Sequence, residues 1–296
     1  CYIEKSPLGE AGGLLRISQF LDENFLFING DIVFDIDLRR LINFHIYYSC
    51  DISFVTHLTT HPEDSDCIAE TQSSSIYAYK LKGEKYTKDI FYLGNAGIAI
   101  VAKKIINLLL QEFPIESQLS LFKDVIIYAH KKGLKVFSYN TSEYLKDMGT
   151  PLRLKQVEID LRNKLNELNS YRNKQNVLFI DRDNTIIKCK KDKYILNAKD
   201  LEFFEDRIIK IAELSKRFNT VIMVTNQPQI SMGLIKYQDV ININSKIILK
   251  CQKLGLNISS FYICPHHPHQ GFDNEISNLK TKCFCRKPLP GLFLEA

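Results

Sequence analysis

The sequence predicts an α/β protein made of two domains joined by a helical linker. In both halves of the 296-residue chain, short apolar runs typical of buried strands alternate with helical patterns. Between the halves, residues 151–175 carry leucines set among charged residues instead. The hydrophobic fraction of 45% and the charged fraction of 25% are those of a folded globular chain. We therefore assign residues 1–150 to a first domain, 151–175 to the linker and 176–296 to a second domain.

The net charge of +5 is divided unevenly along the chain. Residues 1–150 carry 15 Lys and Arg against 19 Asp and Glu, whereas residues 151–296 carry 24 against 15. A basic second half favours phosphorylated small-molecule partners. The chain has no basic stripe interleaved with aromatic residues and no apolar run of roughly 20 residues, which argues against nucleic-acid and membrane partners. We expect a cytoplasmic protein, since the first 30 residues show no secretion signal.

The first domain is predicted to contain strands at four apolar runs separated by helical patterns. Each run is short and rich in β-branched or aromatic residues, as strands of a covered sheet are. The runs span residues 25–30, 51–58, 95–101 and 134–139.

The linker is predicted to be an amphipathic helix. Its apolar residues recur among charges at roughly helical spacing and are Leu152, Val157, Ile159, Leu161, Leu165 and Leu168. We place the domain boundary near residue 172.

The second domain begins with an apolar run, residues 177–180, that ends in Asp181 and Asp183. Further strands are predicted at 220–226 and 259–264. Carboxyl ends of strands are where open α/β sheets bind ligands. There one carboxylate can attack phosphorus, and a second can act as general acid and base. Two carboxylates repel a phosphate, so such a site requires Mg²⁺, for which both aspartates are candidate ligands.

An Asp-x-Asp pair alone is also typical of turns and helix caps, so its context decides the interpretation. The second predicted strand ends in Thr225, Asn226 and Gln227, whose hydroxyl and amides are candidate phosphate ligands. The basic pair Arg286 and Lys287 follows later in the chain.

These segments resemble the haloacid dehalogenase superfamily of phosphatases. "DRDNT" is similar to its nucleophile motif, "VTNQ" to its second motif and "RKP" to its lysine-bearing third motif. The resemblance implies a Rossmann-like phosphatase domain in which Asp181 is the nucleophile and Asp183 the general acid and base. It further implies that Thr225 binds phosphate and that Lys287 neutralises charge in the transition state. We expect Asn226, Gln227 and Arg286 to line the same substrate site.

A cluster of cysteines and histidines between residues 264 and 285 predicts a metal site. Cytoplasmic cysteines are thiols or metal ligands more often than disulfides. Three thiolates and one imidazole make a closed tetrahedral Zn²⁺ site that leaves no position for water, so the zinc is expected to be structural. The predicted ligands are Cys264, His266, Cys283 and Cys285, with His267 and His269 as rival ligands.

"CPHHP", "CFCRKP" and "LPG" resemble the D-glycero-D-manno-heptose 1,7-bisphosphate phosphatases within that superfamily. The resemblance spans residues 177–292 and implies removal of the phosphate on carbon 7, with the same four zinc ligands. Histidinol-phosphate phosphatases are near relatives and remain an alternative. The chain departs from the pattern at Asn184 and Pro228, and the family's further Gly-Asp metal motif is expected beyond Ala296.

The first domain contains polar and glycine-rich segments next to its predicted strands. "SPLGEAGGLL" is a glycine-rich loop that leads into an apolar segment, although an ordinary turn would look alike. "NGD" ends in Asp31 and "DMGTP" begins with Asp147. Two aspartates converging on one Mg²⁺ would suit transfer of a nucleotidyl group to a sugar 1-phosphate, whereas Asp31 alone is also typical of a helix cap.

Together these segments resemble sugar-phosphate nucleotidyltransferases, including the heptose 1-phosphate guanylyltransferases. The resemblance implies a Rossmann-like domain that binds a sugar phosphate and a nucleoside triphosphate, with Asp31 and Asp147 on the metal. The implied substrate-binding residues are Gly9, Lys85, Asn95 and Gly97. Glu10 stands where the family has threonine.

We expect a bifunctional enzyme that makes a nucleotide-activated heptose, with both domains incomplete in this chain. The nucleotidyltransferases' arginine-bearing phosphate loop is expected before Cys1, and the chain begins without methionine. A non-catalytic sugar-nucleotide-binding module is the alternative for the first domain.

Overall fold

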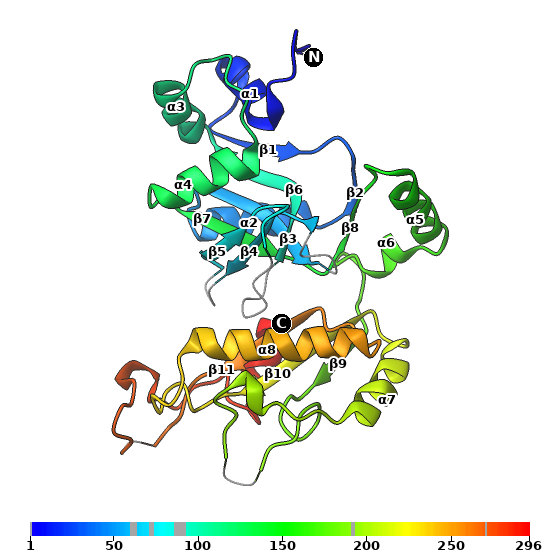
Figure 1. Cartoon of the computed structure of the whole chain (residues 1–296), viewed down its shortest axis with the longest axis vertical. Helices are drawn as coiled ribbons and strands as arrows, with labels where there is room; N and C mark the ends of the chain where they lie inside the picture. The colour runs from blue at the N-terminus through cyan, green and yellow to red at the C-terminus, as the bar shows by residue number, and fades with distance from the viewer. Residues whose placement is uncertain (1, 60–63, 71–73, 86–92, 191–192, 270) are drawn as a thin grey trace. The chain divides into compact units, whose positions relative to one another are not determined.

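The computed structural model describes residues 2–296 except 60–63, 71–73, 86–92, 191–192 and 270 (Figure 1). The described residues form two compact units that meet in sequence between Asn173 and Lys174. Each unit combines a sheet with helices, so the predicted fold class of two α/β domains is confirmed. In the described part of the chain, no helix is long and apolar enough to span a bilayer.

Unit 1, which ends at Asn173, is built on a six-stranded sheet. Its strands run in the order β5-β4-β6-β3-β7, and β1 pairs with the part of β6 that β4 leaves open. All pairs are antiparallel except β3 with β7. The strands are β1 (Asn24–Ile28), β3 (Ile52–Leu58), β4 (Cys67–Glu70), β5 (Ile76–Lys80), β6 (Leu93–Ala102) and β7 (Val136–Asn140).

Both faces of this sheet are covered by helical segments. Neighbouring side chains on β3 point to opposite faces, and both are packed. Phe54 packs edge-on against Phe122 of the π-helical segment η3 (Leu121–Ile126). Val55 belongs to the opposite core cluster, which includes Leu41 of α2. The helices and helical turns are α1 (Gly9–Arg16), η1 (Ser18–Phe20), α2 (Leu38–Tyr47), α3 (Lys103–Glu112), η3 and α4 (Ile127–Lys131).

Strands β2 (Ile32–Asp35) and β8 (Tyr144–Asp147) form a separate two-stranded antiparallel ribbon in unit 1. Helices α5 (Pro151–Arg162) and α6 (Leu165–Leu168) lie against β8. The hydroxyl of Tyr144 on β8 donates to the buried carboxylate of Asp160 on α5. Residues 151–173 of the segment interpreted from sequence as a linker belong to unit 1, and residues 174–175 belong to unit 2.

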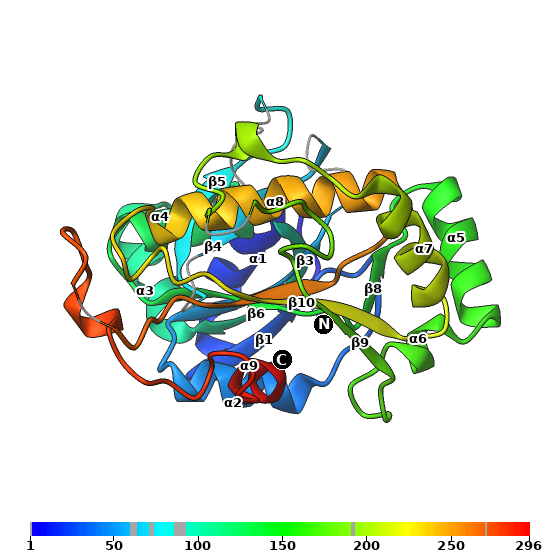
Figure 2. The same ribbon diagram turned by 90° about the horizontal axis from the view of Figure 1, so that it is seen from below.

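Unit 2, residues 174–296, contains a parallel three-stranded sheet in the order β11-β10-β9. The strands are β9 (Val177–Ile180), β10 (Thr220–Asn226) and β11 (Ser260–Cys264). Helix α8 (Tyr237–Lys253) covers one face of this sheet and α9 (Gly291–Glu295) lies on the other, while α7 (Glu205–Ser215) connects β9 to β10 (Figure 2). Short helical turns occur at η4 (Ala198–Asp200) and η5 (Ser277–Leu279).

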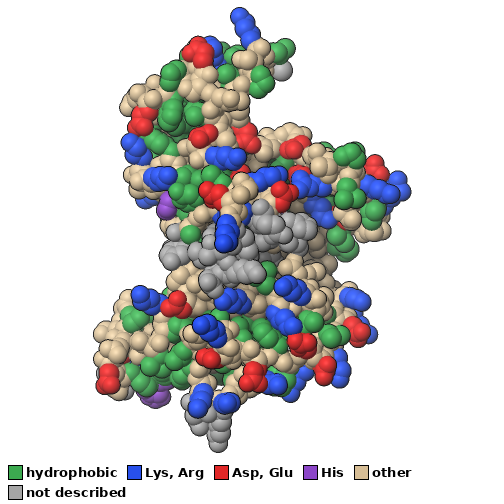
Figure 3. Space-filling model, viewed as in Figure 1, with side chains coloured by type: hydrophobic (Ala, Val, Ile, Leu, Met, Phe, Trp, Pro, Cys, Tyr) green, Lys and Arg blue, Asp and Glu red, His purple; other side chains and the backbone are tan. Residues whose placement is uncertain are grey.

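The sheet of unit 2 is apolar on both faces, as parallel strands between helices must be. On the α9 side, Ile222 and Val224 pack with Leu292 of α9 and with Cys264. On the visible face in Figure 3, Lys and Arg side chains of unit 2 are interspersed with Asp and Glu.

Candidate functional site

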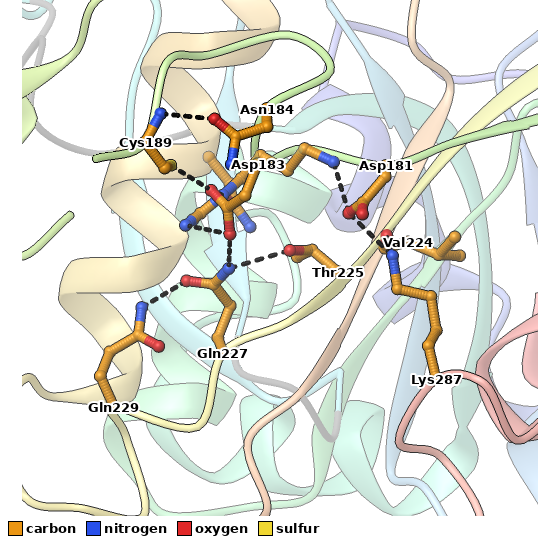
Figure 4. Close-up of polar contacts among 11 residues, drawn as sticks. Asp181, Asp183, Asn184, Cys189, Val224, Thr225, Gln227, Gln229 and Lys287 are labelled. Carbon is orange, nitrogen blue, oxygen red and sulfur yellow. Dashed lines mark hydrogen bonds and ion pairs between the residues drawn. The ribbon is translucent and has the colours of Figure 1, made fainter. Parts of the chain in front are cut away.

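The carboxyl ends of β9 and β10 bring the predicted aspartates and Thr225 to one edge of the unit 2 sheet. The two strands are parallel, and Ile180 pairs with Met223, so Asp181 and Thr225 both follow closely at the same end. Figure 4 shows Asp181 and Lys287 pointing toward one another on one side of Thr225, and Asp183 and Gln227 on the other.

Lys287 is fixed against the predicted nucleophile. Its Nζ lies 2.7 Å from Asp181 Oδ1 and donates to the Val224 carbonyl at 2.8 Å. The Lys287 backbone is anchored as well, because its N–H donates to Asn226 Oδ1 and its carbonyl accepts from Asn226 Nδ2. The Asp181 side chain remains 46% exposed, so its carboxylate is accessible to a ligand.

Asp183 is held by protein donors on both carboxylate oxygens. Oδ1 accepts from Arg182 Nε at 2.9 Å and from the Cys189 thiol at 3.3 Å. Oδ2 accepts from Arg182 Nη2 at 3.2 Å and from Gln227 Nε2 at 2.9 Å. Burial, together with the negative charge of Asp183, raises the pKa of Cys189 to about 11, so this residue is a protonated thiol near neutral pH. These donors fix the orientation of the predicted acid and base.

The predicted phosphate ligands on and after β10 contact one another or the neighbouring site residues. Thr225 is fully buried, and its Oγ1 accepts a hydrogen bond from Gln227 at 2.8 Å. Gln227 itself accepts from Gln229 Nε2, which extends this chain of buried amides. Asn226 and Gln227 thus contact Lys287 and Asp183, respectively.

The turn after Asp183 depends on Asn184, whose backbone adopts the left-handed conformation with a φ of 57°. Asparagine tolerates this region better than most residues because its side chain bonds locally to the backbone. Here Asn184 Oδ1 accepts from the Cys189 N–H at 2.9 Å, which closes the turn and places the Cys189 thiol beside Asp183.

Four side chains form the predicted metal centre in unit 2. One ligand atom from each of Cys264, His266, Cys283 and Cys285 lies within 4.8 Å of every other, and no further group of three or more acidic, Cys or His ligands occurs among the residues that the structure describes. The sulfur atoms are separated by 3.3 to 3.6 Å. Tetrahedral zinc with Zn–S bonds of about 2.3 Å would place them roughly 3.8 Å apart, whereas a disulfide needs about 2.05 Å.

The electrostatics of this centre favour a bound cation. Burial and then the neighbouring thiols raise the pKa of Cys285, and burial is also the main cause of the raised pKa of Cys264. Burial lowers the pKa of His266, which keeps its imidazole neutral and able to bind a metal. Three thiolates are stable at this position only if a positive ion offsets their charge, so the residues present fit Zn²⁺.

The metal centre is continuous with the loop that carries Lys287. Cys283 and Cys285 pack on the core residues Ile222 and Val224. Arg286, which is predicted to bind substrate, donates from Nη1 to the His266 carbonyl at 3.1 Å. The ligand pairs therefore tie both ends of the loop together immediately before Lys287.

In unit 1, Asp31 and Asp147 lie side by side although they are far apart in sequence. The Met148 N–H donates to the Asp31 carbonyl at 2.8 Å, and Ile32 pairs with Asp147 in the ribbon. A Cβ added to Gly149 would lie 3.4 Å from Asp31 Oδ2 and 3.5 Å from Asp147 Oδ1. Both carboxylates thus face the space over this glycine, where Arg153 Nη1 also contacts Asp147 at 2.6 Å.

A small, solvent-open pocket lies beside β1 and β6, and Asn95 and Gly97 line it together with Glu10. Gly97 has a φ of +69°, and a Cβ there would lie 2.7 Å from Asn29 Nδ2, so only glycine fits. The Glu10 carboxylate accepts from Asn29 Nδ2 and from the Leu121 N–H.

Two of the residues predicted to bind substrate in unit 1 do not line this pocket. Gly9 begins α1 next to Glu10, and a Cβ on it would lie 2.5 Å from the Leu119 carbonyl oxygen. Lys85 is exposed in the turn after β5.

Several residues of the unit 2 site were not predicted from the sequence. Arg182 was visible only as the residue between two aspartates, and Asn244 only as a polar position within a helical pattern. Cys189 carried no metal-ligand spacing. Arg182 and Cys189 contact Asp183, and Asn244 contacts Arg182, only because α8 and the turn after β9 fold onto the same strand end.

The comparisons with known proteins cover both units separately. Residues 176–296 match the family model described as polynucleotide kinase 3 phosphatase. Over 119 residues, the chain is 29% identical to the D-glycero-beta-D-manno-heptose-1,7-bisphosphate 7-phosphatase of Yersinia pestis, covering 40% of this chain and 60% of that protein. It is 30% identical over 118 residues to the D-glycero-alpha-D-manno-heptose-1,7-bisphosphate 7-phosphatase of Mycobacterium tuberculosis, covering 40% and 56%.

These matches confirm that the second half of the chain resembles phosphatases. The chain spans about 60% of the length of its Yersinia relative. Among solved structures, a putative glucose-1-phosphate thymidylyltransferase from Bacillus anthracis in complex with a sucrose is similar to 54% of this chain. That match covers 63% of the solved chain at 19% identity with a TM-score of 0.47.

Proposed function

We propose that unit 2 is a phosphatase that removes the phosphate on carbon 7 of D-glycero-D-manno-heptose 1,7-bisphosphate through an aspartyl-phosphate intermediate. The observation that supports this most directly is the accessible Asp181 carboxylate at the end of β9, with Lys287 Nζ 2.7 Å away. The similarity of 119 residues of this chain to the heptose bisphosphate phosphatase of Yersinia pestis supports the substrate class.

In the first half-reaction, an Asp181 carboxylate oxygen bonds to phosphorus as the bond from phosphorus to the sugar oxygen breaks. Asp183, in its protonated form, gives its proton to the departing sugar oxygen, so the sugar leaves as an alcohol. Lys287 offsets negative charge that develops on the phosphoryl oxygens.

In the second half-reaction, Asp183 takes a proton from a water molecule while that water attacks the phosphorus of the Asp181 acyl phosphate. The bond between phosphorus and the Asp181 oxygen breaks, which releases inorganic phosphate and restores the carboxylate. Asp183 regains its proton in this step and is ready for the next substrate.

We assign four side chains to substrate binding, and these are Thr225, Asn226, Gln227 and Arg286. The Thr225 hydroxyl lies between the two aspartates at the strand end (Figure 4). The contacts of Asn226 and Arg286 favour an additional task for these side chains, which is to support Lys287 and the loop before it.

A Mg²⁺ ion would offset the charge of the phosphate against the aspartates and would fit Asp181 better than Asp183. Asp181 Oδ2 has no protein donor among the described residues, whereas both Asp183 oxygens accept from the protein. Mg²⁺ commonly takes one or two carboxylates and completes its shell with waters and substrate phosphate oxygens. The four Cys and His side chains would hold a separate, structural Zn²⁺.

The substrate is tested by phosphate release from the full-length protein. We expect kcat/KM for heptose 1,7-bisphosphate to exceed that for histidinol phosphate, and the release of a heptose 1-phosphate rather than a heptose 7-phosphate. Higher efficiency on histidinol phosphate would reverse this assignment, and assay of both anomers would define the preferred one.

For unit 1 we propose a sugar 1-phosphate nucleotidyltransferase, which would use the heptose 1-phosphate that unit 2 releases. The adjacent Asp31 and Asp147 carboxylates support this, because two carboxylates facing one space can share the Mg²⁺ of a nucleoside triphosphate. Asn95 and Gly97, both assigned to substrate binding, line the same small pocket, which supports a shared task for them. Phosphorylated sugars and nucleotides as substrates favour a cytoplasmic location.

The competing function for unit 1 is a non-catalytic module that binds a sugar nucleotide. Incubation of the full-length protein with GTP and heptose 1-phosphate distinguishes the two. Pyrophosphate and GDP-heptose as products would exclude the module, whereas tight binding of GDP-heptose without turnover would exclude the transferase.

A further inference from the structure

The guanidinium of Arg182 is one of the most deeply buried charged groups described in unit 2. Its side chain is 1% exposed, although it lies between two partly exposed aspartates. Removing a guanidinium from water is costly unless its N–H groups find acceptors. Two of its nitrogens, Nε and Nη2, bind the two oxygens of Asp183 in a bidentate pair.

The third nitrogen of this guanidinium is bound by a residue from another element. Arg182 Nη1 donates to Asn244 Oδ1 at 3.0 Å, and Asn244 is a fully buried residue on α8. Arginine has only donors, so the asparagine must present its oxygen. Asn244 Nδ2 then has no partner among the described residues, which means that the contact to Arg182 is the reason for a polar side chain at this position.

We propose that Arg182 and Asn244 are positioning residues for the reaction at Asp181: Asn244 fixes the guanidinium, and the guanidinium fixes the Asp183 carboxylate toward the leaving group. Rotation of Asp183 about its side-chain torsions would break both charge-assisted hydrogen bonds from Arg182 at once. Gln227, the residue after β10, donates to Oδ2, so the carboxylate is restrained both by Gln227 and, through Arg182, by Asn244 of α8. The inference rests on the proposed phosphatase function of Asp183.

A purely structural role for the Arg182 and Asn244 pair predicts a different outcome from a positioning role. Proton transfer from Asp183 matters greatly when the leaving group is a sugar alcohol and little when it is 4-nitrophenolate, which departs readily without a proton. Hydrolysis of the Asp181 acyl phosphate is common to both esters, so the difference is read from kcat/KM, which reports phosphoryl transfer to Asp181 and not this later step. In kcat/KM, a residue that acts through Asp183 affects the two esters unequally, whereas a general loss of fold affects them equally.

The test compares kcat/KM for heptose bisphosphate and for 4-nitrophenyl phosphate in full-length wild type, Arg182→Lys and Asn244→Leu. Lysine keeps the charge but cannot bind both Asp183 oxygens, and leucine keeps the volume of asparagine but offers no acceptor. We expect Arg182→Lys to lower kcat/KM for the sugar phosphate about 100-fold and Asn244→Leu about 10-fold. The value of kcat/KM for 4-nitrophenyl phosphate should fall by less than about 3-fold in both variants.

Ser245→Ala is the matched control, because it removes a buried hydrogen bond on the same helix, from Ser245 Oγ to the Ile241 carbonyl, without touching Arg182. Its ratio of the two activities should equal that of wild type. Equal losses on both esters, or failure of both network variants to fold, would make the pair structural and overturn the proposal. Wild-type protein that hydrolyses neither ester would instead refute the proposed phosphatase function.

Discussion

The Lys287 ammonium bridges Asp181 Oδ1, at 2.7 Å, and the carbonyl oxygen of Val224, at 2.8 Å. A lysine ammonium has three donors, and these contacts use two of them. The remaining N–H is available for an oxygen of a phosphate bound to Asp181. This arrangement places a fixed positive charge between the ends of β9 and β10, where substrate charge would develop.

Removal of this charge should slow the phosphatase strongly. We expect Lys287→Ala to lower kcat/KM for the sugar phosphate about 100- to 1,000-fold, because a preorganised cation contributes most in the transition state. Lys282→Ala is the control, since Lys282 is an exposed lysine between the ligand pairs of the same loop. Steady-state phosphate release measures both, and a loss below about 5-fold in Lys287→Ala would exclude the charge-neutralising role.

Zinc should be required for both the stability of unit 2 and its activity. We expect elemental analysis to find one zinc per chain, and Cys285→Ser to lose it with a lower melting temperature and a lower kcat. Cys251→Ala, which removes a buried thiol of α8 outside the cluster, should retain the metal.

The zinc site should also weaken in acid. Since the pKa values of the Cys264 and Cys285 thiols are raised, protons compete with zinc for these sulfurs, and affinity should fall as the pH is lowered. Competition with a chromophoric chelator across pH measures this. Zinc affinity independent of pH would contradict thiolate ligation.

Glu70 should make the stability of unit 1 depend on pH. Burial raises the pKa of this carboxyl, which bonds the Ser138 hydroxyl, from 4.5 to about 7. Between these values the folded state keeps a proton that the unfolded state loses, so stability should decrease as the pH rises from 4.5 to 7. Glu70→Gln should remove this loss and add on the order of 2 kcal/mol at pH 8.

Melting temperatures of wild type and Glu70→Gln between pH 5 and 8 check this expectation. The exposed Glu23→Gln should follow the wild-type curve. Parallel curves for wild type and Glu70→Gln would show that Glu70 titrates normally in the folded protein.

Asp31 and Asp147 should bind a divalent cation together. In an Asp181→Asn background, which weakens the unit 2 site, we expect Asp31→Asn and Asp147→Asn each to reduce Mn²⁺ affinity at least about 10-fold in the presence of GTP. Electron paramagnetic resonance of free Mn²⁺ provides the measurement. Asp22→Asn, an exposed aspartate before β1, is the control, and unchanged affinity in the two test variants would exclude a shared metal site.

The strands of unit 2 were predictable because each is a short apolar run that carries its own signal. The runs at 177–180 and 220–226 coincide with β9 and β10, and the run at 259–264 differs from β11 by one residue. In unit 1 the runs at 51–58 and 95–101 correspond to β3 and β6. Strands such as β2 and β4 were missed because each has only three consecutive apolar residues before an acidic residue, whereas β9 has four apolar residues.

The cluster of Cys264, His266, Cys283 and Cys285 was predictable because its members are close in sequence and have the spacing of metal ligands. The Arg182 contact to Asn244 was not, since it joins residues 62 positions apart and depends on how α8 lies across the sheet. For the same reason, the packing of residues 151–168 against β8 was not evident from an amphipathic pattern, which does not specify which surface a helix covers.

The most direct test of the account is to identify the phosphorylated side chain during turnover. Full-length enzyme mixed with substrate, quenched and reduced with borohydride should contain homoserine at position 181, detected by peptide mass spectrometry, because reduction converts an aspartyl phosphate to that residue. The Asp181→Asn variant should contain none and should release no phosphate. Active enzyme that shows reduction at another residue, or at no residue under conditions that trap known aspartyl phosphates, would contradict the central claim.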